Sequence, residues 1–306
     1  MDTYLKGMAM GAADAVPGVS GGTIALITGI YERLIDAVAG LTGQKLIYTA
    51  KILDKDRQSF YRQLKDLEIP FLTVLGAGVL SSLLIVLNLM HYMISSFPVE
   101  TYGFFFGLIA ISALVLYSEV DLSSLRSKLA GLTGFMAAFL LSGYAATSIG
   151  NSLPVVFLSG AVAVSAMILP GISGSLILVI LGQYEYMTAA LSRFTDAVIN
   201  IREAGVGNVA ENAPPVVVFV SGGVVGLLSI AHLVKKALDK YRKATMTFLV
   251  SMIVGALRAP VEEVNVHLAE QGVEWITVLP EFISAAVLGG IMVFILDYRT
   301  LSDSIT

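Results

Sequence analysis

Two short segments combine helix-breaking residues with hydroxyl groups in an otherwise apolar chain. The first reads V-P-G-V-S-G-G-T at residues 16–23, and the second reads I-L-P-G-I-S-G-S at residues 168–175. Free amides at a helix start, together with hydroxyl donors, can bind a phosphate or a carboxylate. We therefore expect an anion site made by Gly18, Ser20, Gly21, Gly22, Thr23, Gly171, Ser173, Gly174 and Ser175. In the alternative, the glycines only allow close packing and the hydroxyls cap helices.

The two segments, called the first and second motif copies below, belong to an internal repeat. One offset of 153 residues gives seven identities within 16 positions. They are Pro17/Pro170, Gly18/Gly171, Ser20/Ser173, Gly21/Gly174, Gly29/Gly182, Tyr31/Tyr184 and Glu32/Glu185. The paired Tyr-Glu after each copy makes chance recurrence of glycine and proline a poor explanation.

The composition is that of a multi-span membrane protein. Hydrophobic residues make up 56% of the chain and charged residues 14%, and the mean hydropathy is +0.81. Apolar stretches predict six spans at residues 70–90, 101–118, 129–150, 215–234, 244–257 and 275–296. The N-terminus lacks the pattern of a signal peptide, so the chain is expected to be mature protein from Met1 onward.

Other functional classes are disfavoured by the same composition. Cysteine is absent, which excludes disulfides and thiolate sites. The pI of 5.4 argues against a nucleic-acid partner, and the three histidines are too scattered for a metal site. No cofactor is expected.

The repeat predicts an all-α fold with two halves, residues 1–150 and 151–306. Each half contains a helical hairpin (3–40 and 154–192) and three spans, and an odd number of spans inverts the second half. The arms 154–169 and 176–191 have 16 residues each, or ~24 Å at about 1.5 Å per residue, which is short of a ~30 Å core. We therefore expect re-entrant hairpins whose turns meet near the membrane midplane. Segment 41–69 predicts an amphipathic helix on the cytoplasmic face, or else a solvated loop.

The distribution of Lys and Arg supports hairpins that enter and leave on one side. With hairpins, 16 of the 19 basic residues share a side, which the positive-inside rule makes cytoplasmic. If each motif copy crossed once, the basic cluster at 235–243 would lie outside. The prediction is a cytoplasmic-membrane protein with both termini in the cytoplasm.

Five ionisable residues are candidates for substrate binding, coupling or gating. Asp14 lies about one turn before the first motif copy and could bind a coupling proton or sodium ion. Glu32 and Glu185 occupy equivalent repeat positions, where interfacial anchoring is the alternative. Arg258 ends a short uncharged run and could offer its guanidinium to a phosphate, with snorkelling as the alternative, and Glu281 could pair with it.

Several stretches resemble the polyprenyl-phosphate transporter family (PopT). They are G-M-A-M-G-A-A-D-A-V-P-G-V-S-G-G-T-I-A-L-I-T-G-I-Y-E-R-L-I at 7–35, F-F-F-G-L-I at 104–109, L-P-G-I-S-G-S at 169–175 and G-A-L-R-A-P at 255–260. The resemblance implies a translocase, not an enzyme, that returns undecaprenyl phosphate or a related polyprenyl phosphate from the outer to the cytoplasmic leaflet. In bacterial members a tryptophan-proline pair tends to follow the last of these stretches, G-A-L-R-A-P. This chain lacks that pair, so the resemblance does not fix the exact position of Arg258.

Two other functions remain open at this stage. The undecaprenyl-pyrophosphate phosphatases have a similar proline-glycine-x-serine motif, but there an arginine follows the serine, and Gly21 and Gly174 stand at that position here. An ion-coupled transporter or channel for a small anion would also fit the polar motif copies. The glycine pairs at 7/11, 103/107 and 222/226 indicate close helix packing, and a homo-oligomer is left open.

Overall fold

The computed structural model describes residues 2–14, 20–42, 45, 57–142 and 150–303, and this part of the chain contains helices and no strand. The predicted all-α class is confirmed. The elements are α1 (Asp2–Asp14), α2 (Gly21–Ile27), α3 (Tyr31–Gly40), α5 (Arg57–Asp66), α6 (Ile69–Ser96), α7 (Pro98–Val115), the 3₁₀ turn η1 (Leu116–Glu119), α8 (Leu125–Leu141), α9 (Leu153–Ile168), α10 (Gly174–Ile180), α11 (Tyr184–Ile199), α12 (Ile201–Ala256), α13 (Arg258–Gln271) and α14 (Trp275–Asp303).

The long helices are suited to a lipid environment. Among the described residues, three stretches are long and apolar enough to cross a membrane, namely Pro98–Glu119, Gly205–Gln271 and Trp275–Phe294. Large apolar side chains project outward from these helices and from α8, and Leu132, Leu233 and Leu288 are each about 60% exposed. Outward-facing leucines at this density are typical of surfaces covered by lipid.

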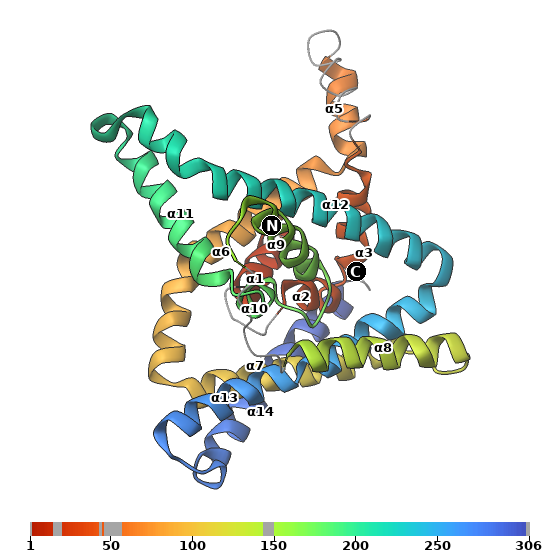
Figure 1. Ribbon diagram of the computed structural model, residues 1–306. Helices are drawn as coiled ribbons and strands as arrows, with labels where there is room; N and C mark the ends of the chain where they lie inside the picture. The colour runs from red at the N-terminus through yellow and green to blue at the C-terminus, as the bar shows by residue number, and fades with distance from the viewer. Residues whose placement is uncertain (1, 15–19, 43–44, 46–56, 143–149, 304–306) are drawn as a thin grey trace.

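Two of the predicted spans, 215–234 and 244–257, lie on either side of a bend in α12. α12 is continuous except at Gly205 and at Tyr241, whose backbone angles (φ −142°, ψ 49°) are not helical. At Tyr241 the helix changes direction, so that α12 crosses the view in Figure 1 and then returns beside α8. The predicted span 129–150 is helical only to Leu141, and residues 143–149 lie outside the described part.

The helix boundaries around the two motif copies follow the sequence repeat. α2 and α10 each contain seven residues and begin 153 positions apart, at Gly21 and Gly174. α3 and α11 then begin at Tyr31 and Tyr184, again 153 positions apart. Residues 176–191 were expected to form one helical arm. The structure instead divides them into α10, a turn and the start of α11. Gly182 (φ 63°) takes the left-handed conformation that ends a helix.

Glycines bring the helix that precedes each motif copy, α1 or α9, against a long helix. A Cβ at Gly7 of α1 would overlap the carbonyl oxygen of Leu75 in α6. A Cβ at the equivalent Gly160 of α9 would overlap that of Phe219 in α12. The backbones therefore approach more closely than any larger residue allows. The helices that precede the two motif copies are thus packed in the same way against long helices.

Two further glycine contacts join the halves of the chain. A Cβ at Gly107 of α7 would overlap the carbonyl of Ala286 in α14, and one at Gly134 of α8 would overlap that of Phe248 in α12. Each of these contacts pairs a helix from residues 1–150 with a helix from residues 151–306. The close packing predicted at the three glycine pairs is confirmed, and it occurs within the chain.

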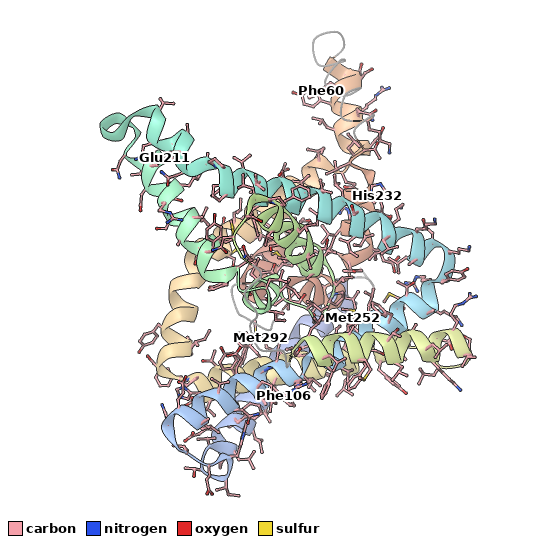
Figure 2. All side chains as sticks on the ribbon, viewed as in Figure 1. Phe60, Phe106, Glu211, His232, Met252 and Met292 are labelled. Carbon is pink, nitrogen blue, oxygen red and sulfur yellow. The ribbon has the colours of Figure 1, made fainter. Side chains whose placement is uncertain are left out.

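The short helices occupy the centre of the molecule. In Figure 1, α1, α2, α9 and α10 lie in the middle of the view and the long helices surround them, while α5 projects away. Met252 of α12, labelled in Figure 2, lies close to this centre and is 1% exposed. The predicted segment 41–69 is described only at residues 41–42, 45 and from 57 onward, and its helical part is α5.

Candidate functional site

The two motif copies contact each other through side-chain hydroxyls. The Ser20 Oγ donates a hydrogen bond to the carbonyl oxygen of Leu169 over 3.1 Å. The Thr23 Oγ1 accepts one from the amide of Gly171 over 3.0 Å. Both hydroxyl residues are 2% exposed. The expected meeting of the motif copies is therefore observed, in a closed arrangement that uses these two hydroxyls.

A carboxylate occupies the helix start of the first copy. The Gly21 amide donates to Asp14 Oδ1 over 2.8 Å, and a Cβ at Gly21 would lie 2.5 Å from Asp14 Oδ2. A Cβ at Gly22 would lie 3.0 Å from the carbonyl oxygen of Ile168, in the other half of the chain. The Gly21 amide, which we expected to face a substrate anion, is thus held by an anion of the protein itself.

The second copy has a different arrangement around the same glycine-serine frame. Gly171 has φ 81°, and a Cβ there would lie 2.6 Å from the carbonyl oxygen of Met252, so both conformation and space require glycine. The hydroxyls of Ser173 and Ser175 are 2.7 Å apart. The side chain of Met167, which occupies the position equivalent to Asp14, lies where a side chain at residue 174 would go. The two copies therefore differ by one charge.

The short length of α2 and α10 changes the electrostatic expectation. Helices of seven residues sum few peptide dipoles, so they supply less positive potential than a long helix would. Any anion held at the motif copies would depend on individual amides and hydroxyls. Gly18, which was also predicted to contribute to the anion site, lies outside the described residues.

Arg258 forms contacts away from the motif copies. Its Nε donates to Glu262 over 2.9 Å, its Nη1 donates to the carbonyl oxygen of Phe139 over 3.2 Å, and its guanidinium carbon lies 4.7 Å from the Phe139 ring centroid. The suggested pairing with Glu281 is wrong, because Glu262, four residues away on the same helix, takes that place. Glu281 is exposed.

Glu32 takes part in an ion-pair network that joins three segments. It accepts from Arg242 over 2.7 Å, and the same guanidinium reaches Glu119 of η1 at 3.3 Å. The network thus connects α3, η1 and the bend of α12, which makes Glu32 a surface ion-pair residue here. Glu185 is the second residue of α11, and its side chain lies outside the described part of the structure.

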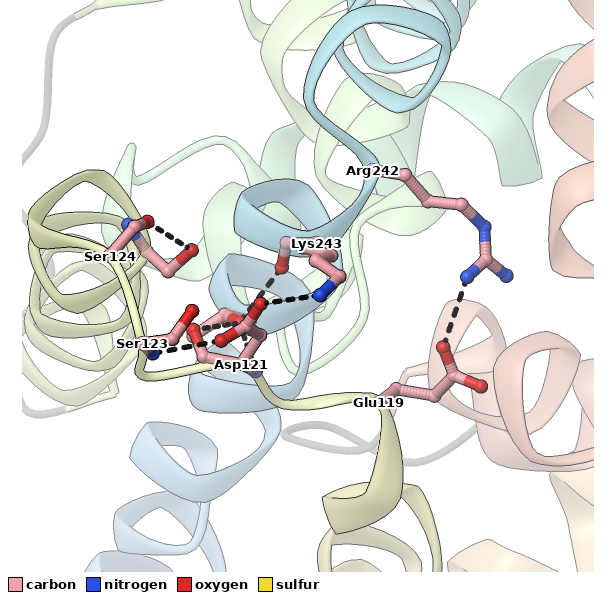
Figure 3. Close-up of polar contacts among 8 residues, drawn as sticks. Glu119, Asp121, Ser123, Ser124, Arg242 and Lys243 are labelled. Atoms are coloured by element: carbon pink, nitrogen blue, oxygen red, sulfur yellow. Dashed lines mark hydrogen bonds and ion pairs between the residues drawn. The ribbon is translucent and has the colours of Figure 1, made fainter.

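A second ion pair lies beside this network (Figure 3). Asp121 contacts the Lys243 ammonium at 3.0 Å and accepts from the Ser123 amide over 2.8 Å. The hydrogen bonds from Ser123 and Lys243 lower the pKa of Asp121 to about 2. The basic cluster at 235–243 indicated topology alone in the sequence, and its acidic partners were missed because they are scattered along the chain.

An apolar groove lies next to the first motif copy. It has a volume of about 440 Å³, and its walls come from α1, α2, α6, α7 and α14. Ala13 and Ile24, on either side of the first copy, contribute to the wall, and Glu100 is the charged residue among the described lining. A groove of this composition can hold a hydrocarbon chain close to the motif contact.

Comparison with known proteins places the chain in a family. The family described as VCA0040-like, undecaprenyl phosphate translocase-like, matches residues 10–273. A polyprenyl-phosphate transporter of Vibrio cholerae serotype O1 is 34% identical over 258 residues, which cover 84% of this chain and 76% of the relative. A polyprenyl-phosphate transporter of Staphylococcus aureus is 28% identical over 302 residues, covering 94% and 95%. No solved structure matches the chain. The chain therefore belongs to the undecaprenyl phosphate translocase-like family.

Proposed function

We propose that the protein transports a polyprenyl phosphate, such as undecaprenyl phosphate, between the leaflets of the cytoplasmic membrane. The observation that carries this proposal is the direct contact between the two motif copies through Ser20 and Thr23 at the centre of an apolar helical protein. Membership of the family and the names of the two relatives support the substrate class. The protein acts as a translocase and leaves the phosphate ester intact.

The two halves form an inverted repeat whose hairpins are re-entrant. The matching boundaries of α2 and α10 support this part of the proposal, as does the equivalent seating of α1 on α6 and α9 on α12. Exchanging the halves also relates the α7–α14 contact to the α8–α12 contact. Such a pair of halves can rock about a shared centre and expose it to each leaflet in turn.

The phosphate passes between the motif copies when they separate. Separation breaks the Ser20–Leu169 and Thr23–Gly171 hydrogen bonds, and the freed hydroxyls and amide become donors for the phosphate oxygens. Ser173, Ser175 and the neighbouring glycines complete the site. The prenyl chain stays in apolar surroundings such as the groove beside Ala13 and Ile24. Arg258 serves as an entry contact for the phosphate, in exchange with Glu262.

Asp14 couples transport to a cation. Its carboxylate and the substrate phosphate compete for the Gly21 amide, because both are anions and the amide is a single donor. At a separation of 4 Å and an effective dielectric constant of 20, two such charges repel by ~4 kcal/mol. Binding of a proton or sodium ion to Asp14 removes this repulsion. The second copy has Met167 at the equivalent position and adds no second charge.

The direction of transport is from the outer to the cytoplasmic leaflet, which returns the carrier lipid for reuse. The basic residues at 235–243 and their partners lie at the cytoplasmic end, and both termini are cytoplasmic. The charge asymmetry of the sequence supports this orientation. Ion pairs join the basic residues of α12 to Glu32, Asp36 and Asp121, which come from distant parts of the sequence, so these segments share one end of the fold.

The packing disfavours a phosphatase-like reaction. A side chain at residue 21 would meet Asp14, and one at residue 174 would meet Met167, so an arginine at either position requires rearrangement. Phosphoryl transfer needs a cation or an equivalent donor set where charge develops. The motif copies supply hydroxyls and amides, which suit reversible binding.

Reconstitution tests the proposal. The full chain is placed in vesicles with labelled undecaprenyl phosphate, and both the loss of label from one leaflet and the release of inorganic phosphate are measured. We expect movement without release, and movement slowed about tenfold or more by Ser20→Ala with Ser173→Ala, because hydrogen bonds to a charged group contribute ~1.5–3 kcal/mol. Release of inorganic phosphate, from this lipid or from undecaprenyl pyrophosphate supplied in a parallel sample, would contradict transport. Full-rate movement by the folded variant would contradict the assigned site.

A further inference from the structure

Three apolar grooves in the described part of the structure differ in the charge that lines them. The groove between α7 and α14 has a volume of about 610 Å³ and no charged residue in its described lining. The groove beside the first motif copy contains Glu100. The groove between α8 and α12, of about 360 Å³, contains Arg126. Since ligand sites commonly have volumes of ~300–1,000 Å³, size does not separate the three, but charge does.

Two cations lie on one aromatic ring at the α8–α12 groove, where Arg126 and Tyr241 line the groove and Lys240 precedes Tyr241 in the chain. The guanidinium carbon of Arg126 lies 4.1 Å from the centroid of the Tyr241 ring, and the Lys240 ammonium lies 5.2 Å from it. Arg126 is also in the first turn of α8, where the helix dipole adds further positive potential. The ring fixes the two cations at the bend of α12.

These two cations have no carboxylate partner in the described part of the chain, unlike several of their neighbours. Lys235 pairs with Asp36, Arg242 with Glu32, and Lys243 with Asp121. Arg126 and Lys240 instead rest on Tyr241. Lys236 of the same segment also has no carboxylate partner among the described residues, but Arg126 and Lys240 share one ring, and two adjacent cations without a carboxylate favour an anion from outside the chain.

The inner end of this groove reaches the motif contact. Leu169 lines the groove, and its carbonyl oxygen is the acceptor for Ser20. The walls between the cations and Leu169 include Ala130, Leu233, Val234 and Phe248, which are apolar. The groove thus joins the two cations to the place where the two motif copies meet.

We infer that the α8–α12 groove binds a polyprenyl monophosphate, with its phosphate on Arg126 and Lys240 and its first isoprene units against α8 and α12. It serves as the station that the lipid occupies on the 235–243 side after it leaves the motif copies. This assignment rests on the proposed function. We choose the single-chain lipid over a two-chain phospholipid because the groove has a volume of only about 360 Å³ and leads to the motif contact.

Photocross-linking tests the assignment, because the chain has no cysteine and one introduced thiol can be labelled alone. Thr133 is exposed and lines the groove, so Thr133→Cys is labelled with a benzophenone maleimide, and Ala237→Cys on the facing wall provides a second position. Val287→Cys, in the uncharged α7–α14 groove, is the control position. The probes are radiolabelled undecaprenyl phosphate, undecaprenol and phosphatidylglycerol.

We expect undecaprenyl phosphate to cross-link at Thr133→Cys and Ala237→Cys well above Val287→Cys. Arg126→Gln should raise the concentration for half-maximal cross-linking roughly tenfold or more, without changing that for undecaprenol. Lys128→Gln, which removes the same charge two residues along α8, should have no effect, since positions i and i+2 do not share a helix face.

Equal cross-linking of phosphatidylglycerol would identify the groove as a general anionic-lipid site and overturn the assignment. An unchanged concentration for half-maximal cross-linking of undecaprenyl phosphate in Arg126→Gln would also overturn it. Transport measured in the same vesicles separates the two proposals. Movement of undecaprenyl phosphate without cross-linking at either position refutes the groove alone. Absence of movement with the unmodified chain refutes the proposed function.

Discussion

Thr23→Val should weaken the contact between the motif copies more than any other single hydroxyl deletion there. Valine keeps nearly the same volume as threonine but cannot accept the Gly171 amide, which lies 3.0 Å from the hydroxyl in a buried position. A buried donor left without a partner costs ~1–3 kcal/mol. Ser20→Ala should cost less, ~1 kcal/mol, because the Leu169 carbonyl also accepts the Ile172 amide at 3.4 Å.

The assay is reversible unfolding in mixed micelles, followed by the fluorescence of Trp275, the single tryptophan of the chain. Thr23→Ser is the matched control, because it retains the acceptor oxygen. The loss of unfolding free energy should be smallest in Thr23→Ser, larger in Ser20→Ala and largest in Thr23→Val. Wild-type stability in Thr23→Val, or an equal loss in Thr23→Ser, would refute the claim that this hydroxyl satisfies the Gly171 amide.

Three further predictions concern coupling, packing and the ion-pair network. Asp14→Asn should abolish any dependence of transport on a proton or sodium gradient, and a gradient response equal to wild type would exclude Asp14 as the coupling residue. Gly107→Ala should lower the unfolding free energy by ~1–3 kcal/mol through overlap with α14, whereas Gly76→Ala, whose Cβ meets nothing within 4 Å, should not. Since both partners are about half exposed, a double-mutant cycle of Arg242→Gln with Glu32→Gln should give a coupling energy below ~1 kcal/mol, and a value several times larger would contradict a surface role.

The parts of the fold that depend on local pattern could be predicted from sequence. Glycine spacing predicted close helix packing, and the offset of 153 residues predicted equivalent helices after each motif copy. A contact between the two motif copies, of which the Ser20–Leu169 hydrogen bond is one part, was also predicted. The polar backbone groups of a helix break inside a membrane need hydrogen-bond partners, and the second copy can provide them.

Features that depend on tertiary docking could not be predicted. The Gly21 amide donates to the Asp14 carboxylate seven positions earlier, a spacing that leaves no periodic signal in the sequence. The pairing of Arg258 with Glu262 is different, because two residues at i and i+4 share a helix face and the pair could have been predicted from local spacing. The bend at Tyr241 lies between the predicted spans 215–234 and 244–257, so a change of direction was expected there, whereas the helical structure on both sides of it up to Tyr241 was not.

The central claim is that the phosphate passes between the two motif copies, and a reversible lock tests it most directly. Ser20→Cys with Leu169→Cys puts a cysteine at each of the two residues that form the contact, in a chain without other cysteines, and transport is measured only on protein in which mass spectrometry has verified the disulfide. In vesicles containing labelled undecaprenyl phosphate, oxidation should stop movement and reduction should restore it, while each single-cysteine variant stays active under oxidation. Full-rate movement by the cross-linked protein would contradict the account.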